Sequence, residues 1–248
     1  MWRGIVAVGS VTALRVNSRK GEGNVYWPLC RGIWREANCA KSTLVVLLAA
    51  PLLADLLWPP FLLLGWEHAR IAPGDTRFTP FDFYYYPWSH SLLMDVVWAA
   101  LLALIFWALR KDLRGAVVVW VGVVSHWLFD WITHRPDLPF FPGTVGRYGF
   151  GLWNSVAGTM TTEIILVIAG VWAYASATKA RDKIGRYAFW SYVILLPALY
   201  IADRFNSPPQ SIAQVAWTAI IASFVSLVWA WWFDSHRDPH SRGASLAD

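Results

Sequence analysis

The chain has 248 residues and a formal net charge of +5; 56% of its residues are hydrophobic and only 15% are charged. A soluble domain of this size usually carries about 25% charged residues, so the composition excludes an ordinary soluble protein. The basic residues gather in short loops between apolar segments, a pattern that argues against nucleic-acid binding. The composition therefore predicts an all-α membrane protein in contact with the lipid bilayer.

Six apolar segments follow one another along the chain, each about long enough to cross a bilayer. They lie near residues 43–66, 87–109, 116–134, 154–177, 187–202 and 212–233. The predicted fold is a polytopic transmembrane helix bundle of about six spans, forming a single domain over residues 42–234. Pro51, Pro59 and Pro60 interrupt the first segment, which predicts a kink or a helix followed by a short re-entrant piece.

Both ends of the chain are polar. Residues 1–41 contain no obvious cleavage site, so they are either a disordered cytoplasmic lead or the product of an upstream start codon. Cys30 and Cys39 lie in this lead with eight residues between them, a spacing that matches no zinc signature and predicts free thiols. Residues 235–248 are predicted to be a polar cytoplasmic tail.

The basic loops predict how the bundle is oriented in the membrane. Short clusters of lysine and arginine at residues 110–114 and 179–186 belong on the cytoplasmic side by the positive-inside rule. With six spans, both termini then also lie in the cytoplasm.

Three ionisable residues share one stripe of the third apolar segment: His126, Asp130 and His134, spaced four residues apart. Four-residue spacing stacks side chains on one face of a helix. Ionisable groups inside a membrane are costly and usually mark a functional site. Histidine and carboxylate at this spacing also suit a divalent metal ion. Two alternatives remain open: a hydrogen-bonded His126–Asp130 pair without metal, and a water-facing His134 at the helix end.

Other polar residues fall at the same predicted depth, in or just above the outer leaflet. Asp55, His90 and Glu163 each lie toward the outer end of a different span. Convergence at one depth allows one ion or one substrate head group to contact several of them. Asp95 follows His90 by five residues and serves either a site or helix packing. Glu163 is either a site carboxylate or a proton-sharing structural group.

Three short motifs follow one another along the chain: LADLLWP at residues 53–59, WSHSLL at 88–93 and SHWLFDWIT at 125–133. Taken in this order, they resemble the YdjM-like (DUF457) family of bacterial inner-membrane proteins, described as membrane-bound metal-dependent hydrolases. The chain departs from the family pattern because it has no histidine before His68. It also has Leu57 and Trp58 where the family carries a further aspartate and histidine.

The resemblance implies an inner-membrane protein with metal ligands at Asp55, His90, His126 and Asp130; the helical spacing adds His134. Mixed histidine and carboxylate ligation suits Zn²⁺, and also Mn²⁺ or Fe²⁺. Such an ion would supply hydroxide near neutral pH.

Glu163 and Asp95 are the predicted general bases. An outward-facing site at the lipid–water interface predicts an ester or phosphoester of a lipid or envelope molecule as substrate. Arg135 or Arg147 is then expected to hold a phosphate. Three other interpretations compete with a hydrolase: a small transporter, a non-catalytic ion-binding protein and a protein with a decayed site. No inverted repeat or pair of broken helices supports transport.

Overall fold

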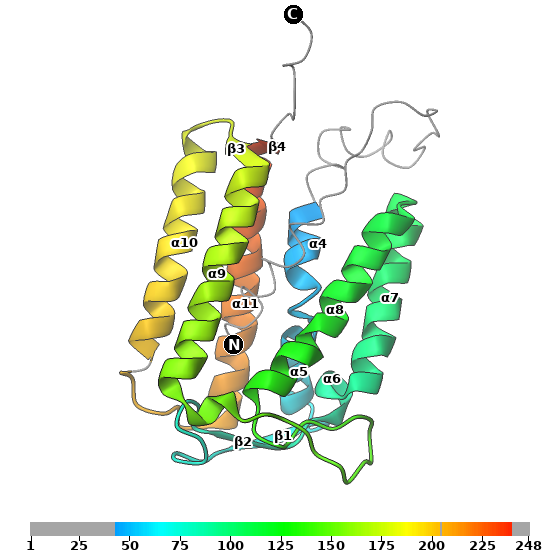
Figure 1. Cartoon of the computed structure of the whole chain (residues 1–248), viewed down its shortest axis with the longest axis vertical. Helices are drawn as coiled ribbons and strands as arrows, with labels where there is room; N and C mark the ends of the chain where they lie inside the picture. The colour runs from blue at the N-terminus through cyan, green and yellow to red at the C-terminus, as the bar shows by residue number, and fades with distance from the viewer. Residues whose placement is uncertain (1–42, 204, 240–248) are drawn as a thin grey trace, which may run out of the picture.

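The computed structural model of the chain describes residues 43–203 and 205–239, and its helices run along the long axis of the molecule (Figure 1). The predictions for the lead at residues 1–41, including Cys30 and Cys39, lie outside the described residues. So do those for the last part of the tail, from residue 240 onward.

Five helices are long and apolar enough to cross a membrane. They are α7 (Leu92–Arg110), α8 (Leu113–Thr133), α9 (Val156–Ala177), α10 (Lys183–Asp203) and α11 (Ile212–Ser235). Large apolar side chains such as Trp172, Ile194 and Phe224 point outward and are more than half exposed, as a lipid-facing surface requires. The prediction of an all-α polytopic bundle is confirmed.

Serine and aspartate side chains begin most of these helices. Ser91, Asp112, Ser155 and Ser211 each accept a hydrogen bond from a backbone N–H in the first turn of α7, α8, α9 and α11. Such caps satisfy donors that the helix itself leaves unpaired.

The first apolar segment is divided into two short helices, α4 (Thr43–Ala49) and α5 (Leu53–Leu63). The chain leaves the helical path at residues 50–52, around Pro51, whereas Pro59 and Pro60 lie inside α5. Pro51 has no backbone N–H to donate to a continuing helix, which explains why α4 ends just before it. This segment is therefore a broken helix beside the five long ones, in agreement with the predicted interruption.

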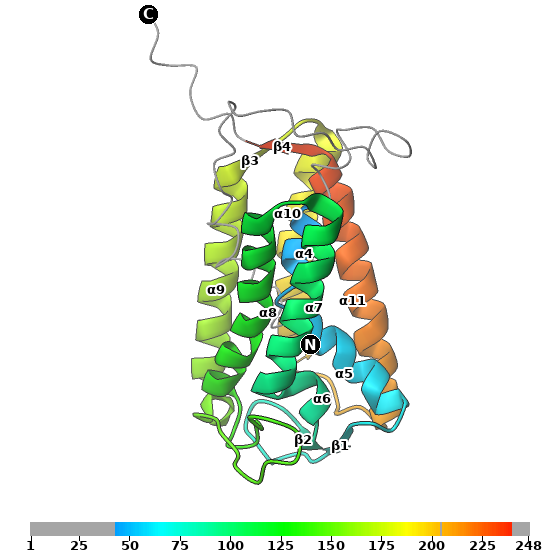
Figure 2. The same cartoon turned by 90° about the vertical axis from the view of Figure 1, so that its right-hand side faces the viewer.

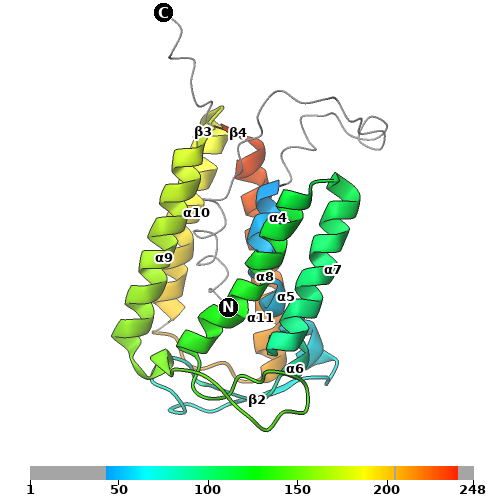
Figure 3. The ribbon, with the colours of Figure 1, turned by 45° about the vertical axis from the view of Figure 1, so that its right-hand side comes forward.

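The helices pack as two groups. Figures 2 and 3 show the bundle from two further sides. In one group, α7 packs against α8 and α8 contacts α4. Their shared core contains small residues, among them Ala99 and Ala103 of α7 and Ala50, which directly follows α4. Small residues let helix backbones approach closely in membranes. In the other group, α9, α10 and α11 share an aromatic core that includes Tyr174, Phe189 and Phe233. Helix α11 also packs against α4 and α5 and so joins the groups.

A loop layer, residues 64–91 and 134–155, closes one end of the bundle (Figure 1). It holds β1 (His68–Ile71) paired antiparallel with β2 (Phe81–Tyr85), the short helix α6 (Pro87–His90) and the 3-10 turn η1 (Leu152–Asn154). Within this layer the chain folds back closely on the residues that follow α8: a Cβ atom on Gly149 would lie 2.2 Å from the carbonyl oxygen of Arg135. Only glycine fits there.

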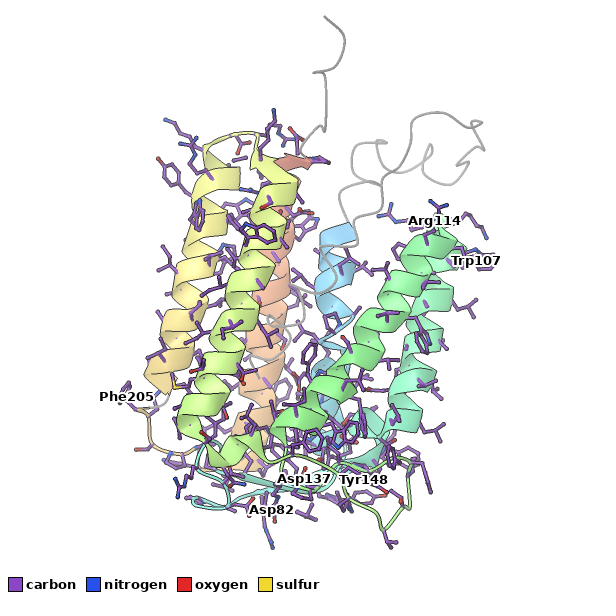
Figure 4. All side chains as sticks on the ribbon, in the orientation of Figure 1. Asp82, Trp107, Arg114, Asp137, Tyr148 and Phe205 are labelled. Atoms are coloured by element: carbon purple, nitrogen blue, oxygen red, sulfur yellow. The ribbon has the colours of Figure 1, made fainter. Side chains whose placement is uncertain are left out.

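At the other end of the bundle, β3 (Thr178–Ala180) pairs with β4 (Arg237–Pro239). Figure 4 shows Asp82 and Asp137 in the loop layer and Arg114 at the opposite end. The basic residues between α7 and α8 and between α9 and α10 therefore lie at the end away from the loop layer.

Candidate metal centre

Helix α8 brings His126 and Asp130 onto one buried face, and His134 follows as the residue that ends the helix. The three side chains are almost completely buried, with 4%, 1% and 4% of each residue exposed. Oδ2 of Asp130 lies 3.1 Å from Nε2 of His126 and 3.5 Å from Nε2 of His134. His134 is therefore buried at the cluster instead of facing water.

A third histidine reaches the same carboxylate from the loop layer. His90 ends α6, and its Nε2 lies 3.8 Å from Asp130 Oδ2 and 3.7 Å from Oδ1 of Asp55 in α5. The ligand atoms of Asp55, His90 and His126 all lie within 4.8 Å of one another. The structure thus brings the predicted metal ligands together as one group, called the His–Asp cluster below: Asp55, His90, His126, Asp130 and His134.

Two of the histidines are fixed on their far side by groups that can only accept a hydrogen bond. Nδ1 of His126 donates to the carbonyl oxygen of Pro51 at 2.9 Å, and Nδ1 of His134 donates to Oδ1 of Asp137 at 2.9 Å. In the neutral ring, Nε2 then keeps a lone pair that faces Asp130. Metal-bound histidines are usually held in this way. The break between α4 and α5 supplies the Pro51 carbonyl.

His90 is held through Ser89 and Glu67, two residues that the sequence analysis did not single out. Ser89 Oγ lies 2.6 Å from His90 Nδ1 and donates to Glu67 Oε2, also at 2.6 Å. Glu67 is 1% exposed and also accepts the backbone N–H groups of Trp88 and Ser89 at 2.8 and 2.7 Å. Burial raises the pKa of Glu67, although these hydrogen bonds oppose that shift. The only sequence signal was a glutamate directly after an apolar segment.

Asp137 and Tyr86 were also missed, and they support His134. The Tyr86 hydroxyl donates to Asp137 Oδ1 at 2.8 Å, and Arg135 Nε lies 3.1 Å from Asp137 Oδ2. Burial alone would raise the pKa of Asp137, but hydrogen bonds from His134, Tyr86 and Arg135 hold it below its ordinary value of 3.8. Arg135 also forms ion pairs with Asp75 and Asp82 in the β1–β2 hairpin.

The two predicted general bases lie in different places. Asp95, in the first turn of α7, is completely buried and interacts electrostatically with His126, His90 and Asp130. Glu163 in α9 accepts a hydrogen bond from the hydroxyl of Tyr200 in α10. The histidine contacts described above involve neither α9 nor α10, so Asp95 is the carboxylate beside the cluster.

The donor set fits a divalent cation. Ligands bonded to Zn²⁺ at about 2.0–2.2 Å lie roughly 3.0–3.5 Å from one another, close to the separations of 3.1–3.8 Å between the imidazoles and carboxylates here. Oδ2 of Asp55 is buried and accepts no hydrogen bond from the described residues. A cation would satisfy this oxygen. Asp55 is also the most accessible side chain of the His–Asp cluster, 19% exposed, and marks its open side.

The sequence model of the YdjM inner membrane protein family matches residues 87–232, more than half of the chain. The chain belongs to this family. With its five long apolar helices, this YdjM-family member is a multi-pass protein of the inner membrane. The matched stretch contains His90, His126 and Asp130, whereas Asp55 and Glu67 precede it. No curated protein and no solved structure matches the chain.

Proposed function

We propose that this YdjM-family protein is a metal-dependent hydrolase that cleaves an ester or phosphoester at the outer face of the membrane. One observation carries the proposal: the Nε2 atoms of three buried histidines converge on Oδ2 of Asp130. The far side of each ring is engaged by a second protein group. Neutral imidazoles together with carboxylates suit Zn²⁺ or Mn²⁺.

The His–Asp cluster would hold a divalent ion, which when bound would supply Lewis-acid chemistry and a water nucleophile near neutral pH. The protein contributes the surroundings. Asp95 is completely buried beside His126 and His90 and is the candidate to accept a proton from the attacking water. Substrate would approach past Asp55, the cluster side chain with the largest exposed fraction.

A pocket of about 350 Å³ in the loop layer offers a place for the anionic part of a substrate. Of its two arginines, Arg135 is already paired with three carboxylates: Asp75, Asp82 and Asp137. Arg147 donates one N–H to the backbone carbonyl of Asp137, and no acidic side chain of the described residues forms an ion pair with it. Arg147 is therefore the residue proposed to hold a phosphate.

The proposed orientation places the loop layer outside the cytoplasm and both termini inside it. Arg110, Lys111 and Arg114 lie at the opposite end of the bundle, as Figure 4 indicates for Arg114. Basic residues in short loops favour the cytoplasmic side. The His–Asp cluster, directly beneath the loop layer, then faces the lipid or envelope molecules of the outer side.

Metal content of the purified protein tests the proposal directly. We expect about one Zn or Mn ion per wild-type chain by elemental mass spectrometry, and loss of the ion in His126→Ala and Asp130→Ala. His68→Ala is the matched control, because His68 is exposed on β1. Asp95→Asn should keep the ion and lose hydrolysis of phosphoester substrates. Absence of metal in a folded wild-type protein, even after loading, would refute the metal centre.

An ion transporter is the second candidate, and the broken helix α4–α5 is the observation that favours it. Transporters often coordinate ions with the carbonyls of an unwound helix. Here the carbonyl of Pro51 is already occupied by His126 Nδ1, which favours a fixed site instead. Uptake of radioactive zinc into proteoliposomes would support transport, and uptake equal to that of empty liposomes would exclude it.

A further inference from the structure

His90 differs from the other two histidines of the His–Asp cluster in how its proton is placed. Nδ1 of His126 faces a carbonyl and Nδ1 of His134 faces the Asp137 carboxylate at 2.9 Å, and both of these groups can only accept. The Tyr86 hydroxyl also lies 3.3 Å from Nδ1 of His134, but it donates its proton to the same carboxylate. His90 Nδ1 instead faces the hydroxyl of Ser89, which can either donate or accept. The direct neighbour therefore does not decide which nitrogen of His90 carries the proton.

Glu67 removes this ambiguity. A serine hydroxyl has a single proton, and that of Ser89 is donated to Oε2 of Glu67 at 2.6 Å. Ser89 must then accept from Nδ1–H of His90, at the same distance of 2.6 Å. The carboxylate itself cannot rotate away, because its Oε1 accepts two backbone N–H groups, those of Trp88 and Ser89. All of these polar groups except the Trp88 amide are buried.

We propose that Glu67 acts through Ser89 as a positioning residue that holds His90 in the Nδ1–H tautomer. Nε2 of His90 then presents a lone pair toward Asp55 and Asp130, at 3.7 and 3.8 Å. The Nε2 lone pair of His90 and the carboxylate oxygens that it faces repel one another unless a cation lies between them. The part of the inference that concerns metal binding rests on the proposed function; the part that concerns the tautomer does not.

Glu67→Gln is the informative change because it reverses the hydrogen bonds without changing the size of the side chain. The amide oxygen can keep both backbone N–H groups, which places the amide NH₂ against Ser89. The NH₂ donates to Oγ, so the hydroxyl proton of Ser89 turns toward His90 Nδ1. The favoured tautomer of His90 then carries its proton on Nε2, and this nitrogen can no longer bind an ion.

The tautomer can be measured without metal by ¹⁵N NMR of histidine-labelled protein in lipid bilayers. The measurement is made at a pH at which the ¹⁵N shifts show the neutral His90 ring. The His90 signals are assigned by their loss in His90→Gln. We expect Nδ1–H in the wild type and Nε2–H in Glu67→Gln. The same His90 tautomer in both proteins would overturn the inference.

Zinc affinity, measured by competition with a chelator, tests the consequence for the ion. Glu67→Gln should weaken binding about 10- to 100-fold, the usual effect of losing a group that orients a ligand. Asp112→Asn is the matched control: it also replaces a carboxylate by an amide, at the exposed N-cap of α8, where asparagine caps equally well. An affinity of Glu67→Gln equal to that of Asp112→Asn would contradict the inference.

A double-mutant comparison separates positioning from a general structural effect. If Glu67 acts through the hydroxyl of Ser89, Glu67→Gln should change zinc affinity little in a Ser89→Ala background. An equally large effect in both backgrounds would overturn the route through Ser89. A wild type that binds no zinc would refute the proposed function, whereas the metal-free NMR measurement would still decide the tautomer.

Discussion

At the scale of single residues, each histidine of the His–Asp cluster commits one nitrogen to a protein group and turns the other toward Asp130. Spacing along α8 is enough to bring His126 and Asp130 together, because four residues make about one helical turn. This spacing does not determine which groups form hydrogen bonds with the Nδ1 atoms of the histidines. Ser89 and Glu67 are 22 residues apart in sequence, and only the folded loop layer brings them into contact.

A prediction at this scale concerns Arg147. Arg147→Gln should weaken binding of phosphatidic acid or glycerol 3-phosphate by roughly 10- to 100-fold, since a charge-assisted hydrogen bond contributes about 1.5–3 kcal/mol. Native mass spectrometry in detergent measures the lipid, and calorimetry measures the soluble phosphate. Arg77→Gln removes the same charge from another exposed position of the loop layer and is the control. Equal binding by both variants would remove Arg147 from the proposal.

At the scale of elements, ion pairs connect the β1–β2 hairpin of the loop layer to the residues that follow α8. Arg135, just beyond α8, pairs with Asp75 and Asp82 of the β1–β2 hairpin and with Asp137. Asp137 in turn receives hydrogen bonds from Tyr86, directly after β2, and from His134. The hairpin is therefore tied to the same residues that support the His–Asp cluster.

This arrangement predicts an acid-sensitive contribution of Asp137 to stability. Its pKa in the folded protein lies below 3.8, so its contribution is complete above about pH 4 and is lost as the pH falls through the folded-state value. Asp137→Asn should lower the melting temperature at pH 6, and its difference from the wild type should shrink below pH about 4. Thermal unfolding in detergent at several pH values measures this. A difference that is independent of pH would contradict the assignment.

At the scale of the whole molecule, the His–Asp cluster and the basic turn between α7 and α8 lie toward opposite ends of the bundle. The loop layer covers the His–Asp cluster at one end, and Arg114 marks the basic end in Figure 4. Apolar surfaces of α7 to α11 lie between them and match the thickness of a bilayer. A hydrolase open on one side fits this separation better than a transporter, which needs access from both sides.

The orientation is testable by labelling single cysteines introduced into a variant that lacks Cys30 and Cys39. Cysteine at Asp75, in the loop layer, should react with a membrane-impermeant maleimide in intact cells. Cysteine at Lys111, in the short exposed turn between α7 and α8, should react only after the membrane is opened. The opposite labelling pattern would place the His–Asp cluster on the cytoplasmic side.

The sequence by itself determined the class of protein, the apolar helices and the face of α8 that carries His126, Asp130 and His134. These features follow from composition and from local periodicity, which act within one segment of the chain. The resemblance to the YdjM-like family and the shared depth of the polar residues added His90 and Asp55. The sequence offered both Asp95 and Glu163 as general bases and did not separate Asp95, beside the cluster, from Glu163, which is hydrogen-bonded to Tyr200.

Only the tertiary structure decided which groups stand behind the histidines: the Pro51 carbonyl, Ser89 with Glu67, and Asp137 with Tyr86. It also decided that Arg135 is paired with carboxylates, whereas no acidic side chain of residues 43–203 and 205–239 forms an ion pair with Arg147. These contacts join residues far apart in the chain through loops and a broken helix. The geometry of such segments is set by packing against their neighbours and not by a repeating pattern in the sequence.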